Sequence, residues 1–271
     1  MRILTCFHIT ADLEQLSEEE WAAGSKAGRI DTSYIKKTIS CFDEGALEMA
    51  CRLSDSLREA GETCSLAAVT AGSMEADSYL KTLAALGFEQ IYRIDTEGRS
   101  PETMTSEWAA GILSEWISRQ APFDLILTGQ RSGDGNQGKI PLLLAEASGI
   151  PCITHVCDFH PAENGGITVR WERDDGICET RLDSPAVLAV ENAVGAYLRV
   201  PTLRQRLSAG SIVPEVICRQ DASPLPDEPA SVSLRRLLPV TEKRDAVMAD
   251  GSDPEEAARQ MAQYYRKWIN G

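Results

Sequence analysis

The segment whose residues are best suited to chemistry is a glycine-rich loop between an expected buried strand and an expected helix. It covers residues 129–138 and reads GQRSGDGNQG. Glycines let the backbone turn tightly and bring N–H groups close to a ligand, and the helix N-terminus that follows carries partial positive charge. Phosphate groups bind well in such a setting. The loop therefore predicts a nucleotide or phosphate site, the alternative being a flexible surface loop without a ligand.

The side chains of this loop supply neutral, positive and negative groups. Ser132, Asn136 and Gln137 offer neutral hydrogen-bonding groups, and Arg131 offers a positive charge. Asp134 would repel a phosphate, so we expect it to cap the helix or to bind a ribose hydroxyl. The candidate ligand-binding residues of the loop are Gly129, Gln130, Arg131, Ser132, Gly133, Asp134, Gly135, Asn136, Gln137 and Gly138.

This segment does not match known catalytic or cofactor-binding motifs well. Gly133, Gly135 and Gly138 match the G-x-G-x-x-G spacing of a dinucleotide-binding turn, and Asp158 follows 20 residues later. That fingerprint belongs directly after a strand, usually the first, whereas here four residues separate Thr128 from Gly133. An NAD-dependent oxidoreductase is therefore kept as an alternative. No P-loop, G-x-S-x-G or H-E-x-x-H sequence occurs, so we expect no catalytic residues.

Eight cysteines and three histidines do not have the spacing of a metal site. The closest cysteines, Cys152 and Cys157, have four residues between them, and no CxxC pair occurs. His155 and Cys157 lie at strand spacing and are expected to point the same way. His8 is expected to end the first strand at the ligand edge of the sheet, either facing the site or serving as a hydrogen-bonded structural residue. We expect no metal, and buried reduced thiols as in a cytoplasmic protein.

The charge of the chain excludes some partners. Its 271 residues include 27 Lys and Arg against 41 Asp and Glu, which gives a net charge of −14. Nucleic acids and anionic membrane surfaces require a basic footprint, so we expect neither as a partner. The charge is uneven: residues 1–218 hold 19 basic and 32 acidic groups (net −13), and residues 219–271 hold 8 and 9 (net −1). We find no signal-peptide pattern and no membrane-spanning apolar run, which favours a cytoplasmic protein without membrane insertion.

Strands that alternate with amphipathic helices form the scaffold that would position the loop. This order predicts an α/β fold with an open, mostly parallel sheet and helices on both faces. Loops after the strands then meet at one edge of the sheet, where ligands bind. Met104, Trp108, Ile112 and Trp116 repeat every fourth residue and are expected in the core. We expect strands near 2–9, 65–70, 90–94 and 124–128, and helices from about 43, over 75–86, from Pro101 and over 139–147.

The pattern changes after Gly149. Segments near 152–159, 166–172, 177–183 and 186–190 predict strands joined by turns, as an antiparallel extension of the sheet. We divide the chain into a nucleotide-binding domain, 1–218, and a linker with a C-terminal arm, 219–271. The linker, 219–234, is rich in proline, and a helix should begin at Asp253 and Pro254. Its apolar face must cover some surface, on its own domain or on a partner: Ala257, Met261, Tyr264, Tyr265 and Trp268.

Four segments taken together resemble one known family. The first strand ends on Cys6, Phe7 and His8, and residues 40–44 (SCFDE) look like an Asn-Pro-Phe-Asp-Glu segment that opens a first helix. Residues 129–138 look like a nucleotide-binding loop, and residues 172–187 look like a signature that precedes a strand. Across roughly residues 1–205, the chain resembles the beta subunit of electron transfer flavoproteins.

The resemblance implies a fold, cofactors and partners. The fold is adenine-nucleotide-hydrolase-like, with a C-terminal arm that reaches onto an alpha subunit. The chain would be half of a heterodimer, sharing FAD with the alpha subunit and burying either AMP or a second FAD itself, as in electron-bifurcating members. A dehydrogenase, of acyl-CoA type or similar, would be the electron partner, so the chain would be an electron-carrier subunit rather than a stand-alone enzyme. A stand-alone adenine-nucleotide-binding signalling protein of the same fold is the alternative.

The resemblance also implies site residues, and it shows where this chain departs from the family. Besides the loop, the nucleotide pocket would include Cys6, Ser40, Phe42, Asp43 and Ala71. Residues 196–203 would correspond to the dehydrogenase-docking region. His8 stands where the family has a lysine, Ser-Cys at 40–41 replaces Asn-Pro, the loop is one or two residues shorter, and 197–201 matches in outline. These departures indicate a divergent branch.

Overall fold

The computed structural model describes residues 1–28, 30–96, 104–133, 136–163, 165–183, 185–191, 196–218, 248 and 251–269. The described residues of 1–17 and 31–218 form one compact unit, and those of 18–30 and 248–269 form another. Pro101, Asp134, Gly135 and the expected linker 219–234 lie outside the described residues.

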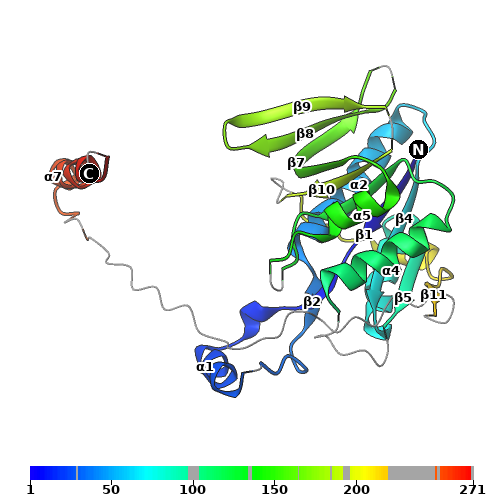
Figure 1. The fold of residues 1–271 in the computed structure, drawn as a ribbon, viewed down its shortest axis with the longest axis horizontal. Coiled ribbons are helices and arrows are strands. Elements are labelled where there is room, and N and C mark those ends of the chain that lie inside the picture. The colour runs from blue at the N-terminus through cyan, green and yellow to red at the C-terminus, as the bar shows by residue number, and fades with distance from the viewer. Residues whose placement is uncertain are drawn as a thin grey trace. The chain divides into compact units, whose positions relative to one another are not determined.

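The first unit is built on a sheet of nine described strands (Figure 1). Their order is β11-β5-β4-β1-β6-β10-β7-β8-β9; neighbours from β11 to β7 are parallel, and β7–β8 and β8–β9 are antiparallel. The predicted mostly parallel sheet with an antiparallel extension is therefore confirmed. The strands are β1 (Arg2–Cys6), β4 (Ser65–Gly72), β5 (Phe88–Asp95), β6 (Leu125–Gly129), β7 (Cys152–Pro161), β8 (Ile167–Arg173), β9 (Gly176–Leu182), β10 (Ala186–Val190) and β11 (Glu215–Ile217).

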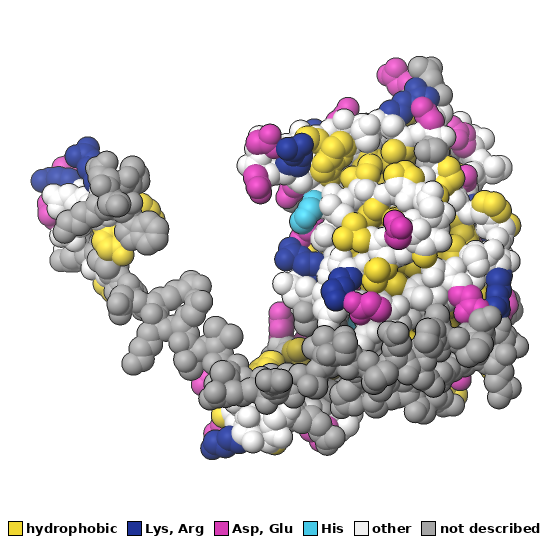
Figure 2. Space-filling view, viewed as in Figure 1, with side chains coloured by type: hydrophobic (Ala, Val, Ile, Leu, Met, Phe, Trp, Pro, Cys, Tyr) yellow, Lys and Arg dark blue, Asp and Glu magenta, His cyan; other side chains and the backbone are white. Residues whose placement is uncertain are grey.

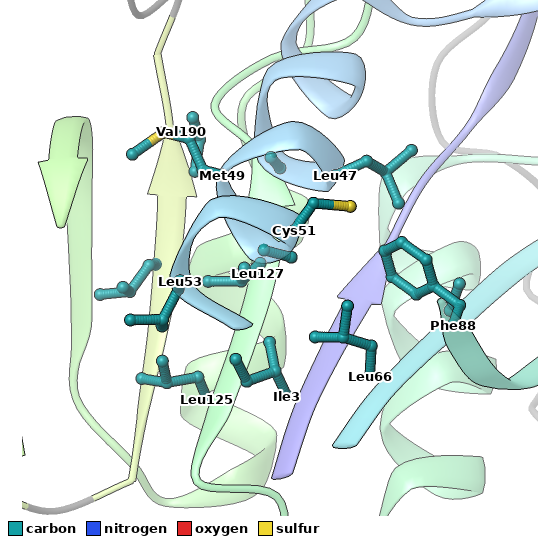
Figure 3. Close-up of a cluster of buried hydrophobic side chains, with 14 of the residues drawn as sticks. Ile3, Leu47, Met49, Cys51, Leu53, Leu66, Phe88, Leu125, Leu127 and Val190 are labelled. Atoms are coloured by element: carbon teal, nitrogen blue, oxygen red, sulfur yellow. The ribbon is translucent and has the colours of Figure 1, made fainter. Parts of the chain in front are cut away.

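Helices cover both faces of this sheet because its central strands are apolar on both sides. Successive residues of β1 alternate between two core clusters: Ile3 packs in the cluster of α2 and α3, and Leu4 in the cluster of α4 and α5. Figure 3 shows side chains of α2, including Leu47, Cys51 and Leu53, directed at the sheet. The described helices of this unit are α2 (Cys41–Glu59), α3 (Asp77–Ala85), α4 (Ser106–Ser118), α5 (Ile140–Ser148) and α6 (Leu203–Ser208).

The outer face of α4 and α5 is partly apolar. Figure 2 shows apolar side chains gathered over the face that these helices cover. Leu142 of α5 is 53% exposed there. Single exposed apolar residues are ordinary on protein surfaces, so this face alone indicates no partner.

The order of the strands creates a crevice beside β1. The chain runs from β1 to β4 and β5 on one side, then returns to place β6 on the other side of β1. Helices that follow β1 and β6 therefore leave the sheet in opposite directions. In open α/β sheets, ligands bind outside the carboxyl ends of the strands at such a point. The fold thus marks the ends of β1 and β6, and the loop after β6, as the place to look for a site.

Two expected element boundaries were wrong at this edge. The first strand ends at Cys6 rather than near residue 9, because Ser40 N donates to His8 O and Asp43 accepts from His8 N, which turns the chain away. Residues Ile9–Ala11 (β2) then pair with Lys37–Ile39 (β3) in a separate antiparallel pair. Helix α4, which was expected to begin at Pro101, begins at Ser106 with Thr105 as its N-cap, so Met104 precedes the helix.

Strand β10 was also placed wrongly by the sequence pattern. We expected residues 186–190 within the antiparallel extension, but β10 lies between β6 and β7 and is parallel to both. All five of its residues are buried, which fits a strand covered on both faces. Helix α6, strand β11 and the elements between residues 11 and 40 were not predicted, since these short segments have little periodicity.

The second unit contains two described helices. Helix α1 covers Glu18–Ala27, with three glutamates in its first turn. Helix α7 covers Pro254–Ile269 and begins as predicted, because Asp253 Oδ1 accepts hydrogen bonds from the N–H groups of Glu255 and Glu256. Met261, Tyr264 and Tyr265 are 46–61% exposed; the side chain of Trp268 lies outside the described part. No described helix is long and apolar enough to cross a bilayer.

Candidate functional site

A cavity of about 310 Å³ opens at the carboxyl edge of the sheet, where β1, β4 and β6 end. The strand ends contribute its floor, α4 and the start of α5 contribute one wall, and the loop after β6 contributes another. Its lining residues are Cys6, Phe7, His8, Asp43, Ala71, Met104, Thr105, Ser106, Trp108, Ala109, Leu113, Thr128, Gly129, Arg131, Ser132, Gln137 and Ile140.

Asp43 ties three parts of the cavity together. It lies in the first turn of α2 and is buried. Its Oδ2 accepts from His8 N at 2.8 Å, and its Oδ1 accepts from Gly129 N at 2.7 Å. Both bonds are charge-assisted, and they join the ends of β1 and β6 to the helix. The carboxylate thus has a structural use that lowers its repulsion toward an anionic ligand.

The approach of α2 to β6 requires glycine at position 129. A Cβ on this residue would lie 2.5 Å from Asp43 Oδ1 and 2.8 Å from both Asp43 N and Phe42 Cβ. Distances this short are steric clashes with a backbone that has no room to move. Gly129 therefore allows the helix N-terminus and the strand end to meet at the rim of the cavity.

The loop is held in shape by its own hydrogen bonds. Ser132 N donates to Gln137 O at 3.0 Å, and Gln137 N donates to Ser132 Oγ at 3.1 Å. Ser40 Oγ, buried at the N-cap of α2, accepts from Gly133 N at 3.1 Å. Asn136 has a φ of 53°, in the left-handed region that asparagine tolerates better than most residues. The described parts of the loop on either side of residues 134–135 are therefore joined to each other, and the loop is anchored to α2 at Gly133.

The first turn of α4 is fastened to the same loop. Ser106 Oγ donates to Gln137 Oε1 at 2.7 Å, and Lys139 Nζ lies 2.8 Å from Glu107 Oε1. The Lys139 hydrogen bond lowers the pKa of the Glu107 carboxyl. These two contacts bring the first turn of α4 to the cavity. In the sequence, the rest of α4 and strand β6 lie between that turn and the loop.

Arg131 brings a positive charge to the cavity, but a carboxylate shares it. Its Nη2 lies 2.8 Å from Glu191 Oε1, and its guanidinium lies 5.4 Å from the centre of the Phe42 ring. Glu191 Oε2 also contacts His155 Nδ1 at 3.0 Å. His155 has a φ of 55° at an irregularity of β7, and its N–H donates to Gln130 Oε1. This network fixes Arg131 at the rim.

Cys6 places a thiol on the cavity floor. It is 4% exposed, and burial, aided by the nearby Asp43 carboxylate, raises its pKa well above the usual range. The thiol therefore stays protonated at neutral pH and behaves as a small apolar group rather than a nucleophile.

The expected site residues divide into those that line the cavity and those that support it. Cys6, Asp43, Ala71, Gly129, Arg131, Ser132 and Gln137 line it. The others described stand behind this lining: Ser40 and Gly133 bond each other, Phe42 packs beneath Arg131, Gln130 N donates to Val190 O, Asn136 shapes the turn, and Gly138 packs on Gln130 O.

Sequence patterns missed the wall that α4 contributes. Met104 and Trp108 were expected in the core with Ile112 and Trp116; Trp108 does pack against that core, but both residues also line the cavity. The four-residue period was a correct signal for one helix face. It could not reveal that the sheet ends beneath the first turn of α4, so that the same face covers core at one end and cavity at the other.

His155 and Cys157 do not share a partner. His155 contacts Glu191, whereas Cys157 Sγ lies 3.4 Å from Arg170 O on β8. Within the described ranges, no group of three or more His, Cys, Asp or Glu side chains is arranged to hold a metal ion.

A second feature lies along α2, away from the cavity. Glu48 is 4% exposed and accepts bonds from Arg199 N at 3.0 Å, from Arg199 Nη2 at 2.9 Å and from Arg52 Nε at 3.1 Å. Arg199 Nη1 also donates to Asp55 Oδ2 at 2.6 Å. We call these contacts the Arg199 clamp. In the same stretch of sequence, residues 197–213, large apolar side chains are 72–82% exposed: Tyr197, Val200, Leu203, Leu207 and Val213.

Comparison with known proteins agrees with this architecture. The electron transfer flavoprotein domain family matches residues 28–203, which is more than half of the chain. The chain is 32% identical over 267 residues to the Escherichia coli (strain K12) protein named "Putative electron transfer flavoprotein subunit YgcR", across 98% of this chain and 97% of that protein. A match of this length includes the strands, the loop after β6 and the segment that carries Arg199. The chain belongs to the electron transfer flavoprotein family.

Proposed function

We propose that the chain is the beta-type subunit of a heterodimeric electron transfer flavoprotein and that its cavity holds an adenine nucleotide. The nucleotide is free AMP or the AMP half of a second FAD. The observation that carries this proposal is the cavity at the carboxyl edge, enclosed by a glycine loop and the first turns of three helices. Family membership supplies the flavin context.

The residues of the cavity fit such a ligand. About 310 Å³ is at the lower end of the range for small-molecule sites, which suits one mononucleotide moiety. Ile140 lines the cavity at the first residue of α5, where the helix N-terminus carries partial positive charge. Thr128 Oγ1 and Arg131 Nε are buried without a hydrogen-bond partner among the described residues. Such atoms fit a site that receives polar groups.

The charges at the cavity support a phosphate on the loop side. Arg131, Ser132 and Gln137 line that side, where the Arg131 guanidinium and the partial positive charge of the α5 N-terminus favour an anion. Asp43 does not oppose this assignment strongly, because its two oxygens already accept N–H groups. Net charge of the whole chain is thus a poor guide to what one enclosed site accepts.

The flavin shared with a partner subunit would supply reversible electron transfer. This chain would support the fold around the flavin, exclude water from its own cavity and provide the surfaces on which the partner proteins dock. The exposed apolar side chains of residues 197–213 suit contact with an electron partner such as a dehydrogenase. The exposed aromatic face of α7 suits contact with the alpha subunit. A cytoplasmic location is part of the proposal and fits eight unpaired cysteines.

Co-expression with an alpha subunit tests the proposal. We expect a stable one-to-one complex that is yellow and is bleached by dithionite. A colourless complex after FAD addition would contradict the proposal, as would a chain that stays monomeric and binds adenine nucleotide without a partner. The second outcome would favour the stand-alone nucleotide-binding alternative.

A further inference from the structure

The apolar stripe of α4 serves two purposes along its length. Trp116 packs on Tyr92 of β5 with ring centres 4.7 Å apart, and it is 7% exposed. Trp108, two turns earlier on the same face, is only partly buried and lines the cavity. Because α4 follows β5, its first turn starts at the carboxyl edge of the sheet, and the strands beneath it end there. Trp108 therefore packs against the edge of the core cluster that contains Trp116 and also lines the cavity.

The cap of α4 fixes the position of Trp108. Thr105 Oγ1 accepts from Trp108 N at 3.2 Å, and Ser106 on the same turn bonds Gln137 of the loop at 2.7 Å. Trp108 also lines a small cavity of about 30 Å³, with Ile112 and Trp116. Trp108 thus borders both this small space and the large cavity.

The large cavity is lined by both polar and apolar groups. The polar groups come from the loop, from Asp43 and from Thr105 and Ser106 at the start of α4. Trp108, Ala109 and Leu113 of α4, with Met104 before the helix, supply apolar wall opposite the strand ends. A ligand that carries a phosphate at the loop must therefore present a flat or apolar group to α4.

We infer that Trp108 is a specificity-determining residue whose indole stacks on the adenine base of the nucleotide. The inference rests on the proposed function, since it assumes that the cavity binds an adenine nucleotide. An aromatic side chain beside an otherwise apolar wall gives a heteroaromatic base a face to stack on. Met104 adds a polarisable thioether to the same wall.

The expected effect follows from stacking energies. Loss of one base–aromatic contact typically weakens binding by about 5- to 100-fold. Trp108→Ala should therefore raise the Kd for AMP by a factor in this range. Trp108→Phe keeps an aromatic face and should lose less. Trp116→Phe is the matched control, because Trp116 shares the helix and the residue type but packs in the core.

The test uses the full chain in complex with its alpha subunit, after the resident nucleotide has been removed. Titration calorimetry measures Kd for AMP and for ribose 5-phosphate, which lacks the base. We expect Trp108→Ala to weaken AMP binding by at least 5-fold and ribose 5-phosphate binding by less than about 2-fold. AMP should also change the tryptophan fluorescence of the wild type and of Trp116→Phe, and should not change that of Trp108→Phe.

The outcomes separate this inference from the proposed function. If the wild type binds neither AMP nor FAD in this cavity, the proposed function fails. If the wild type binds AMP and Trp108→Ala binds it equally well, the stacking role is overturned and the proposed function stands. Equal losses for AMP and ribose 5-phosphate would also overturn it, because they would show an effect on the fold or on the phosphate end.

Discussion

At the scale of single residues, Gly129 determines how closely α2 approaches β6. Its N–H bonds Asp43, a residue 86 positions away in sequence, and its missing Cβ leaves room for that bond. No local pattern could predict this pairing, because glycine also occurs at loop positions that need only flexibility. The sequence predicted that residues 129–138 form a ligand-binding loop, and the structure shows that Gly129 is the glycine that leaves no room for a Cβ beside Asp43.

Gly129→Ala should therefore destabilise the chain and the site. Its Cβ would clash with the Asp43 carboxylate and backbone, at a cost of about 3 kcal/mol or more in the free energy of unfolding. Urea denaturation of the heterodimer measures this cost. Gly45→Ala, in α2, is the control: its Cβ would meet Ala196 at 3.8 Å, an ordinary contact, so helix propensity should stabilise it by about 0.5–1 kcal/mol. Equal stability of the two variants would contradict the steric argument.

Cys6 should react slowly with alkylating agents. Burial raises the pKa of its thiol, so little thiolate exists at pH 8, whereas Cys41 is exposed at the start of α2. Peptide mass spectrometry after iodoacetamide treatment should show Cys41 modified well before Cys6, and added AMP should slow Cys6 further. Modification of Cys6 at the rate of Cys41 would show that the cavity floor is open to solvent.

At the scale of elements, α2 connects the cavity to the exposed apolar segment. Its first turn holds β1 and β6 through Asp43, and Glu48, five residues later, holds Arg199. Sequence periodicity predicted α2 and the alternation of strands with helices, since those signals are local. It could not predict that Glu48, on a helix, pairs with a residue 151 positions away. It also misplaced β10, because strand direction depends on which neighbours a strand finds.

The Arg199 clamp should make stability depend on acid pH. Burial raises the pKa of the Glu48 carboxyl, but hydrogen bonds from Arg199 outweigh it, so the folded-state pKa lies below its ordinary value. A carboxyl with a lowered pKa stabilises the fold above its unfolded pKa of about 4.3, and this contribution is lost as pH falls through the folded value. The stability advantage of wild type over Glu48→Gln should therefore shrink as pH drops below about 4.3.

Replacement of Arg199 alone should lower the free energy of unfolding more than replacement of Arg199 and Glu48 together. Arg199→Gln leaves Glu48 buried with Arg52 alone, and we expect a loss of about 1–3 kcal/mol in the free energy of unfolding. The pair Glu48→Gln with Arg199→Gln leaves no buried charge and should lose less than Arg199→Gln alone. Hydrogen exchange of residues 196–208 should rise in Arg199→Gln. Unchanged exchange there would show that the clamp does not hold the segment.

At the scale of the whole molecule, a chain of net charge −14 encloses a cavity suited to a nucleotide. Net charge describes long-range attraction, whereas an enclosed site depends on the few groups that face it. Here those groups are the loop, Arg131 and the helix first turns. The acidic body and the near-neutral C-terminal residues match the division of labour we propose, with nucleotide binding in the first and partner contact in the second.

The adenylate content of the purified heterodimer tests the central claim most directly. Denaturation followed by chromatography and mass spectrometry counts AMP and FAD per complex. We predict two adenylate groups per heterodimer, either as one FAD and one AMP or as two FAD, with the second lost in Gly129→Ala. One FAD and no further adenylate per wild-type heterodimer would contradict the claim that this cavity binds a nucleotide.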